Sequence, residues 1–144
     1  TGLRDLCGQD AVLKTHLTET IGLFEKLDEA EYQALRQRFD ETLREREYLF
    51  EQLLVYLVHR HFLEYGKTVT PCLKLMAVSF AAIRAMAARL WQETGTLTDR
   101  VFTELCWHAA RCVEDTPESY QRLLRAFETE EVYKMERLQR LLWN

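Results

Sequence analysis

The sequence predicts an all-α fold, a single-domain bundle of about six or seven helices around a buried antiparallel hairpin over residues 47–92. Hydrophobic residues make up 47% of the 144 residues, which is enough for one core and too many for a disordered chain. The chain has only two prolines and five glycines, as expected for long helices joined by short turns. Apolar residues recur at spacings of three and four, and no stretch alternates as a half-buried strand does. We therefore expect residues 1–144 to form one helical domain.

The longest apolar run, residues 71–92, is predicted to be the central helix. Thr70 provides an N-cap, Pro71 suits the first helical position, and Gly95 follows the predicted end. A helix of this length extends about 33 Å. Basic residues are costly within a bilayer, so we expect a core helix and no membrane insertion. The three that interrupt the run are Lys74, Arg84 and Arg89.

Residues 47–65 are predicted to form the other helix of the hairpin. They are apolar on nearly all sides, which is typical of a largely buried helix. Gly66 is a natural stop, and only residues 66–70 separate the two helices. So short a connection indicates an antiparallel pair.

Helices are also predicted on both sides of this hairpin. Asp10 can cap a helix that extends to about residue 27, with Val12, Leu13, Leu17, Ile21 and Phe24 as its apolar face. Asp28 and Glu31 have the spacing of a capping box at the start of the next helix. We expect the charged face of that helix to be solvated; it carries Arg36, Arg38, Glu41, Arg44, Glu45 and Arg46. Further helices are expected over about residues 98–114, 117–127 and 130–142, the first of them capped by Thr98.

A buried ion pair is predicted between Glu51 and Arg84. The stripe of the central helix expected to face the core consists of Leu73, Ala77, Phe80, Ala81, Arg84, Ala88 and Trp91. A guanidinium in such a stripe needs a partner. If the hairpin turns near Thr68, Glu51 and Arg84 lie at the same level of antiparallel helices. The alternative is that both side chains extend outward to solvent.

The overall charge does not indicate a nucleic-acid partner. The net charge is −4, with acidic and basic residues interspersed, whereas phosphate binding requires a basic stripe. No signal peptide is visible, and we expect a cytoplasmic protein. The chain begins at Thr1 without a methionine, so we expect it to be the C-terminal part of a longer protein.

The sequence contains no recognisable metal or nucleotide site. The four cysteines, Cys7, Cys72, Cys106 and Cys112, lie far apart and include no CxxC pair, which favours buried free thiols over disulfides. Glu104, His108 and Cys112 share one helical strip, but no second ligand pair accompanies them, so we expect no metal site. No GxSxG, GxGxxG or Walker loop is present.

Four segments of the sequence carry a resemblance to a known protein family. They are FEQLLVYLVHRHF (50–62), KLMAVSFAAIRAMAARLW (74–91), GTLTDRV (95–101) and ARCVEDTPESYQRLLRAF (110–127). In these segments the chain resembles the C-terminal helical region of the flagellin lysine-N-methylase family. The matching single residues are Glu51, Arg60, Phe62, Trp91 and Glu114. Two positions depart from the family: its Asn is Gln52 here, and its Glu-His pair is Glu114-Asp115. If the family's histidine is functional, Asp115 puts activity in doubt.

The resemblance implies methyl transfer from S-adenosylmethionine to lysine side chains of flagellin. It also implies a cysteine-rich segment that would hold an iron–sulfur or other metal centre, and this chain lacks such a segment. The transfer requires a deprotonated amine aligned with the sulfonium, in a site that excludes water. Aromatic and carboxylate groups suit such a site, and the candidate catalytic residues are Glu51, Tyr56, Trp107 and Glu114. Trp107 can equally cover the core.

Two other functions remain open from the sequence. The chain could be a non-enzymatic interaction or adaptor domain that binds a partner helix on an exposed apolar face. It could also position flagellin without binding the methyl donor.

Overall fold

The computed structural model describes residues 11–63, 69–114, 121 and 125, and the part it describes is helical with no strand. The helices, in chain order, are α2 (Ala11–Lys26), α3 (Glu29–Leu43), α4 (Glu47–Leu57), α5 (Val69–Thr94) and α6 (Asp99–Glu114). A 3₁₀ turn, η1 (Arg44–Arg46), joins α3 to α4, and a π-helical segment, η2 (Val58–Leu63), continues α4. The predicted all-α class is confirmed.

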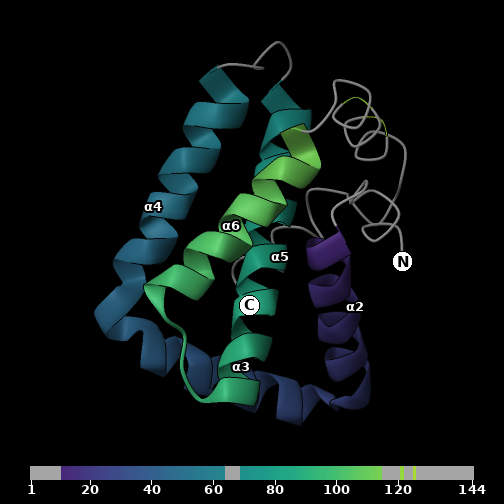
Figure 1. The fold of residues 1–144 in the computed structure, drawn as a ribbon, viewed down its shortest axis with the longest axis vertical. Coiled ribbons are helices and arrows are strands. Elements are labelled where there is room, and N and C mark those ends of the chain that lie inside the picture. The colour runs from purple at the N-terminus through teal and green to yellow at the C-terminus, as the bar shows by residue number, and fades with distance from the viewer. Residues whose placement is uncertain (1–10, 64–68, 115–120, 122–124, 126–144) are drawn as a thin grey trace.

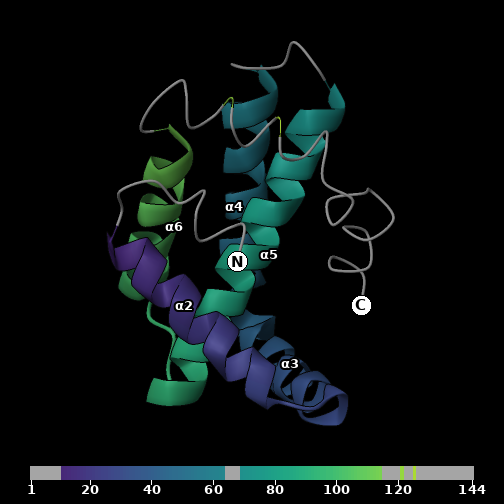
Figure 2. The ribbon, with the colours of Figure 1, turned by 90° about the vertical axis from the view of Figure 1, so that its right-hand side faces the viewer.

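Helix α5 is the centre of the bundle, as predicted. It contacts α2, α3, α4, η2 and α6. Figure 1 shows α4 and α2 on either side of it, α3 crossing beneath and α6 lying in front; Figure 2 gives the same arrangement from the side. No helix among the described residues is long and apolar enough to cross a membrane.

The helix ends that the sequence predicts from local signals are largely confirmed. Asp28 accepts a hydrogen bond from the backbone N–H of Glu31, and the Glu31 carboxylate accepts one from the N–H of Asp28, which completes a capping box. The Thr98 hydroxyl accepts from the N–H of Val101 at the start of α6. Gly95 ends α5 with a φ of 75°, a left-handed conformation that glycine adopts without strain. By contrast, α5 begins at Val69, so Thr70 lies inside the helix and is not its cap.

The buried face of α5 differs from the predicted stripe. Leu73 is exposed, and of the predicted stripe Ala88 alone is buried among residues that the structure describes. The buried residues of α5 are Cys72, Leu75, Val78, Ile83, Met86, Ala87, Ala88 and Arg89. Because apolar residues occupy nearly every side of this helix, periodicity alone does not define its inner face.

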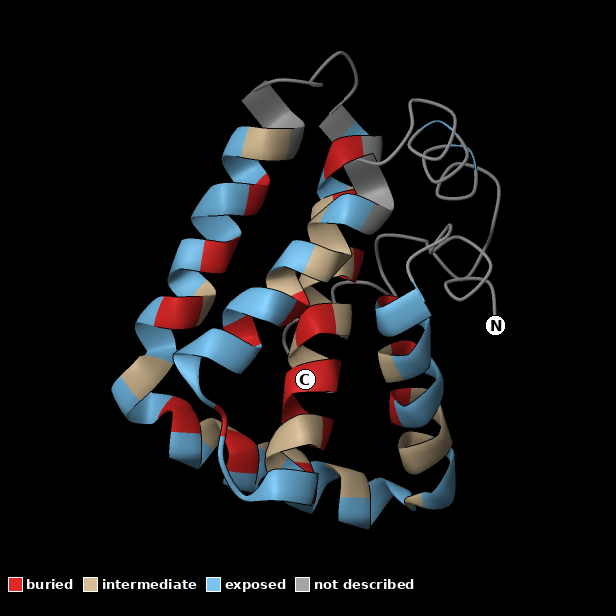
Figure 3. Cartoon of the chain, viewed as in Figure 1, coloured by how far each residue is buried: buried red, intermediate tan, exposed pale blue. Residues whose placement is uncertain are grey.

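Helix α4 is buried on one stripe only, so the prediction of a largely buried helix is wrong. Leu49, Leu53 and Leu57 point into the core. The opposite face is exposed despite its apolar composition, and it includes Tyr48, Leu54, Val55 and Val58. Figure 3 shows the buried residues of α4 on the side that faces α6 and α5. Val12, which the sequence predicts on the apolar face of α2, is also exposed.

Parts of the predicted architecture lie outside the described residues. Helix α4 contacts α5, but the connection at 64–68 is outside the described ranges, so the complete hairpin stays a prediction. The same is true of the helices expected after Glu114 and of the total of six or seven. Cys72 is a buried free thiol as predicted, and Cys106 is a half-buried one; Cys7 and the Cys112 side chain lie outside the described part.

Candidate functional site

The candidate site is an apolar groove between α4 and α6, with a volume of about 330 Å³. The two helices are held together near their N-terminal ends, where the Arg46 guanidinium bonds the Asp99 carboxylate and the Leu97 carbonyl. The groove is lined by Leu49, Gln52, Leu53, Tyr56, Phe102, Thr103, Cys106, Trp107 and Ala110.

Helical periodicity explains why these side chains share the groove. On α4, the lining residues Gln52, Leu53 and Tyr56 follow Leu49 by three, four and seven positions, which places all four on one face. On α6, Cys106, Trp107 and Ala110 follow Thr103 at the same three distances, and Phe102 adjoins Thr103. The deepest members are buried, whereas Tyr56 and Trp107 are exposed at the rim. The groove therefore has a leucine and phenylalanine floor and an aromatic, accessible edge.

Trp107 presents its ring to a cation. The side chain is 54% exposed, and the Arg111 guanidinium carbon lies 4.8 Å from the ring centroid. The imidazole of His108 packs against the ring edge-on at 4.9 Å. A guanidinium over an indole face is attracted by the ring quadrupole. The rim of the groove thus already holds one positively charged side chain.

The groove thiol is not a reactive nucleophile. Burial raises the pKa of Cys106 to about 11, because the apolar wall disfavours the thiolate. At neutral pH the thiol is protonated and acts as part of the apolar lining.

The four candidate catalytic residues predicted from the sequence do not all lie at the groove. Tyr56 and Trp107 line the same groove. Glu51 is exposed on α4 and does not line it. Glu114 is the last residue of α6, and its side chain lies outside the described residues. The groove also contains Gln52, the residue at the position where the resembling family has Asn.

The predicted ion pair between Glu51 and Arg84 does not form in the structure. Arg84 pairs with Asp40 of α3, and Glu51 is exposed to solvent. The prediction assumed that the α4 helix covers the arginine face of α5. That face is covered by α3 instead, which contacts α5 and supplies the carboxylate.

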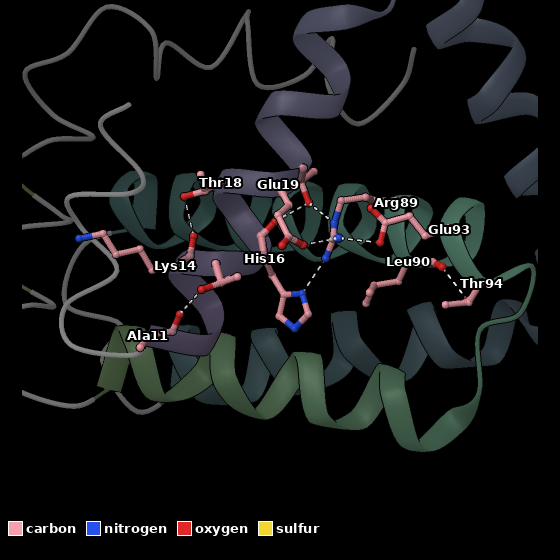
Figure 4. A network of polar contacts seen from close by, with 11 residues as sticks. Ala11, Lys14, His16, Thr18, Glu19, Arg89, Leu90, Glu93 and Thr94 are labelled. Atoms are coloured by element: carbon pink, nitrogen blue, oxygen red, sulfur yellow. Dashed lines mark hydrogen bonds and ion pairs between the residues drawn. The ribbon is translucent and has the colours of Figure 1, made fainter.

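Among the described residues the buried arginine is Arg89, for which the sequence pattern predicted no partner. Its side chain is 1% exposed and enters the space between α5 and α2 (Figure 4). It lies 2.7 Å from Glu19 and 2.9 Å from Glu93, and Nε donates to the Thr20 hydroxyl at 3.1 Å. The sequence contains a signal for part of this cluster, because Arg89 precedes Glu93 by four positions, the spacing of a helical ion pair.

His16 completes this cluster as an acceptor. Its Nδ1 lies 2.7 Å from the Arg89 guanidinium, which can only donate, so Nδ1 must carry a lone pair and the ring is neutral. Burial, followed by the charge of Arg89, lowers the pKa of His16, with His108 acting in the same direction and Glu19 and Glu93 opposing. The cluster joins α2 to α5 and has a structural role.

The lowered pKa of His16 predicts a pH-dependent stability. The His16 ring binds a proton more readily in the unfolded chain than in the folded one. The contribution of neutral His16 to the free energy of unfolding is therefore fully present above the ordinary histidine pKa of about 6.5, and it is lost as the pH falls below that value. We expect the fall in melting temperature between pH 7.5 and pH 5.5 to be smaller in His16→Gln than in wild type. The exposed His59→Gln serves as control and should retain the wild-type fall. Equal falls in wild type and His16→Gln would contradict the assignment.

The described residues contain no group of three or more His, Cys, Asp or Glu side chains placed to hold a metal ion. Glu104 of the strip considered above bonds Arg100 at 3.1 Å. The described part of the chain therefore offers an apolar, aromatic-edged groove as its candidate site.

The comparisons with known proteins identify the family. A comparison with curated proteins and one with solved structures each gave no match. A sequence model of the FliB lysine N-methylase C-terminal domain matches residues 3–141, which is nearly the whole chain. The expectation drawn from the resemblance is thereby confirmed at the level of the family: the chain belongs to the FliB lysine N-methylase C-terminal domain family.

Proposed function

We propose that this domain takes part in methylating lysine side chains of flagellin, with S-adenosylmethionine as the methyl donor. The observation that carries the proposal is the family match over residues 3–141. Flagellin and the donor are inferred from the resemblance of residues 50–127. The structural support is a groove whose chemistry suits a lysine side chain.

The α4–α6 groove suits both parts of a lysine side chain. Its floor, formed by residues such as Leu53 and Phe102, can pack against the four methylene groups. Tyr56 and Trp107 at the rim can contact the amine end, and Trp107 already faces the Arg111 cation. Partial desolvation in such a groove lowers the pKa of an ammonium group, which favours the neutral amine that attacks the methyl carbon. In this proposal the groove binds the target lysine and partly shields it from water.

The proposal is tested by titrating this protein with flagellin monomers before and after acetylation of the flagellin lysines. Acetylation removes the positive charge and the amine nucleophile while keeping most of the flagellin surface. We expect the acetylated flagellin to bind roughly two- to thirtyfold more weakly, because a cation on an exposed or partly desolvated aromatic face contributes roughly 0.5–2 kcal/mol. Equal affinities would show that lysine side chains are not what the domain recognises.

A second candidate function, a non-enzymatic interaction domain, is favoured by the exposed face of α4. Tyr48, Leu54, Val55 and Val58 are between 41% and 58% exposed on this one helix and its continuation. Clustered exposed apolar side chains are typical of surfaces that bind a partner helix. Binding through this face would be insensitive to lysine acetylation and would be lost in Val55→Lys.

A further inference from the structure

A separate cavity of about 200 Å³ lies between α3, α5 and the end of α2. It shares no lining residue with the α4–α6 groove. The cavity exists because α5 presents Ala81, Ala85 and Ala88, spaced by four and three positions, towards the aromatic side chains of its neighbours. Three methyl groups in succession leave space that larger side chains would fill.

The walls combine aromatic rings with two guanidinium groups. Phe39, Phe80 and Tyr32 supply rings, and Arg36 and Arg84 supply positive charge. Phe39 is 1% exposed, so one wall is part of the buried core. An apolar cavity with a few convergent polar groups is the usual form of a small-molecule site.

The charges at this cavity do not balance. Arg84 is paired with Asp40. Arg36 is half-buried, and it forms no ion pair or hydrogen bond with any residue that the structure describes. Of the two guanidinium groups in this largely apolar wall, Arg84 is paired with a carboxylate and Arg36 has no such partner among the described residues. A half-buried cation in such surroundings favours an anionic partner.

We propose that this cavity binds a small carboxylic acid with an apolar, preferably aromatic, body. The carboxylate would pair with Arg36, and the body would pack among Phe39, Phe80 and the three alanines. A guanidinium matches a carboxylate with two parallel hydrogen bonds. The nearby Asp40 carboxylate disfavours a doubly charged phosphate, because the excess charge to be neutralised is a single unit.

The volume sets the size of the ligand. In another protein an apolar cavity of about 150 Å³ binds benzene. A cavity of about 200 Å³ has room for a ring that carries a short carboxylate arm. This inference is independent of the proposed methylation, since it rests on a different cavity.

The test is a calorimetric or NMR titration with phenylacetate, alongside two analogues of the same shape, 2-phenylethanol and phenethylamine. We expect phenylacetate to bind with a Kd of about 1 mM or tighter. The neutral alcohol should bind about tenfold more weakly, because it carries no charge and cannot accept two parallel hydrogen bonds from Arg36. The cationic amine should not bind measurably, because an ammonium group has no acceptor for the guanidinium and is repelled by it. Absence of phenylacetate binding, or equal binding of the alcohol, would overturn the proposal.

Two variants locate the site. Arg36→Gln should weaken phenylacetate about tenfold while changing the affinity for the alcohol little. Arg38→Gln is the matched control, because Arg38 is exposed on the same helix and does not line the cavity. Ala85→Leu should fill the cavity and abolish binding of both compounds; if that variant does not fold, Arg36→Gln still decides. An equal loss in Arg36→Gln and Arg38→Gln, or no loss in either, would overturn the proposal.

Discussion

Replacing Arg89 with methionine should lower the free energy of unfolding by about 3 kcal/mol. Arg89 is 1% exposed and bonds Glu19, Glu93, Thr20 and His16 between α2 and α5. Methionine fills part of the volume but donates no hydrogen bond, so His16 Nδ1 is left without its donor in a partly buried place. Both glutamates are 54% exposed and can rehydrate, which keeps the loss at the lower end of the range for a broken buried pair.

Urea denaturation measures this loss, with Arg100→Met as the matched control. Arg100 also pairs with a glutamate four positions later, but its side chain is 87% exposed. Such a surface pair contributes little, and we expect the control to change stability by less than about 0.5 kcal/mol. A similar small loss in both variants would mean that the Arg89 cluster does not join α2 to α5.

Replacing Trp107 with alanine should weaken flagellin binding at least about tenfold, if the proposed function holds. The Trp107 ring edges the groove and is 54% exposed, so its removal takes away the largest accessible aromatic surface of the site. Half of the ring is already in water, so we expect the free energy of unfolding to fall by no more than about 1 kcal/mol. The expected result is therefore a binding defect in a folded protein.

Val101→Ala is the control for this variant. Val101 is an exposed apolar residue of the same helix that does not line the groove. It should leave flagellin affinity within about twofold of wild type. If Val101→Ala weakens binding as much as Trp107→Ala, the contact surface is not the groove.

Local sequence signals predict the helix ends of this protein well. The capping box of Asp28 and Glu31, the Thr98 cap and the glycine at position 95 each depend on residues a few positions apart. The residues that determine each of these helix ends lie within a few positions of it, and the structure confirms each prediction. The 3₁₀ turn at Arg44–Arg46 likewise lies directly before residue 47, where the sequence predicts that the next helix begins.

The inner faces of the helices are not predictable in the same way. Arg84 bonds Asp40 instead of Glu51 because α3 covers that side of α5, and only the tertiary arrangement decides which helix does so. Arg89 finds its partners on α2, about 70 positions earlier in the chain. Helix periodicity identifies which residues share a face, but it does not say which neighbour that face meets.

The candidate site is predicted in part. Tyr56 and Trp107, chosen as aromatic residues near a possible pocket, do line one groove. Glu51 does not, because it lies on the exposed side of α4, away from the residues spaced with Leu49 and Leu53. The groove arises from the packing of α4 beside α6, a contact between elements that are separated by α5 in the sequence.

Methyl transfer itself is the most direct test of the account. The measurement is the incorporation of label from methyl-labelled S-adenosylmethionine into flagellin, catalysed by the protein that carries this domain, followed by mapping of the labelled residues by mass spectrometry. The account predicts label on flagellin lysines, and at flagellin concentrations below saturation it predicts at least about a tenfold lower rate in Trp107→Ala. Label on no lysine, or an unchanged rate in Trp107→Ala, would contradict a role for the α4–α6 groove in lysine methylation.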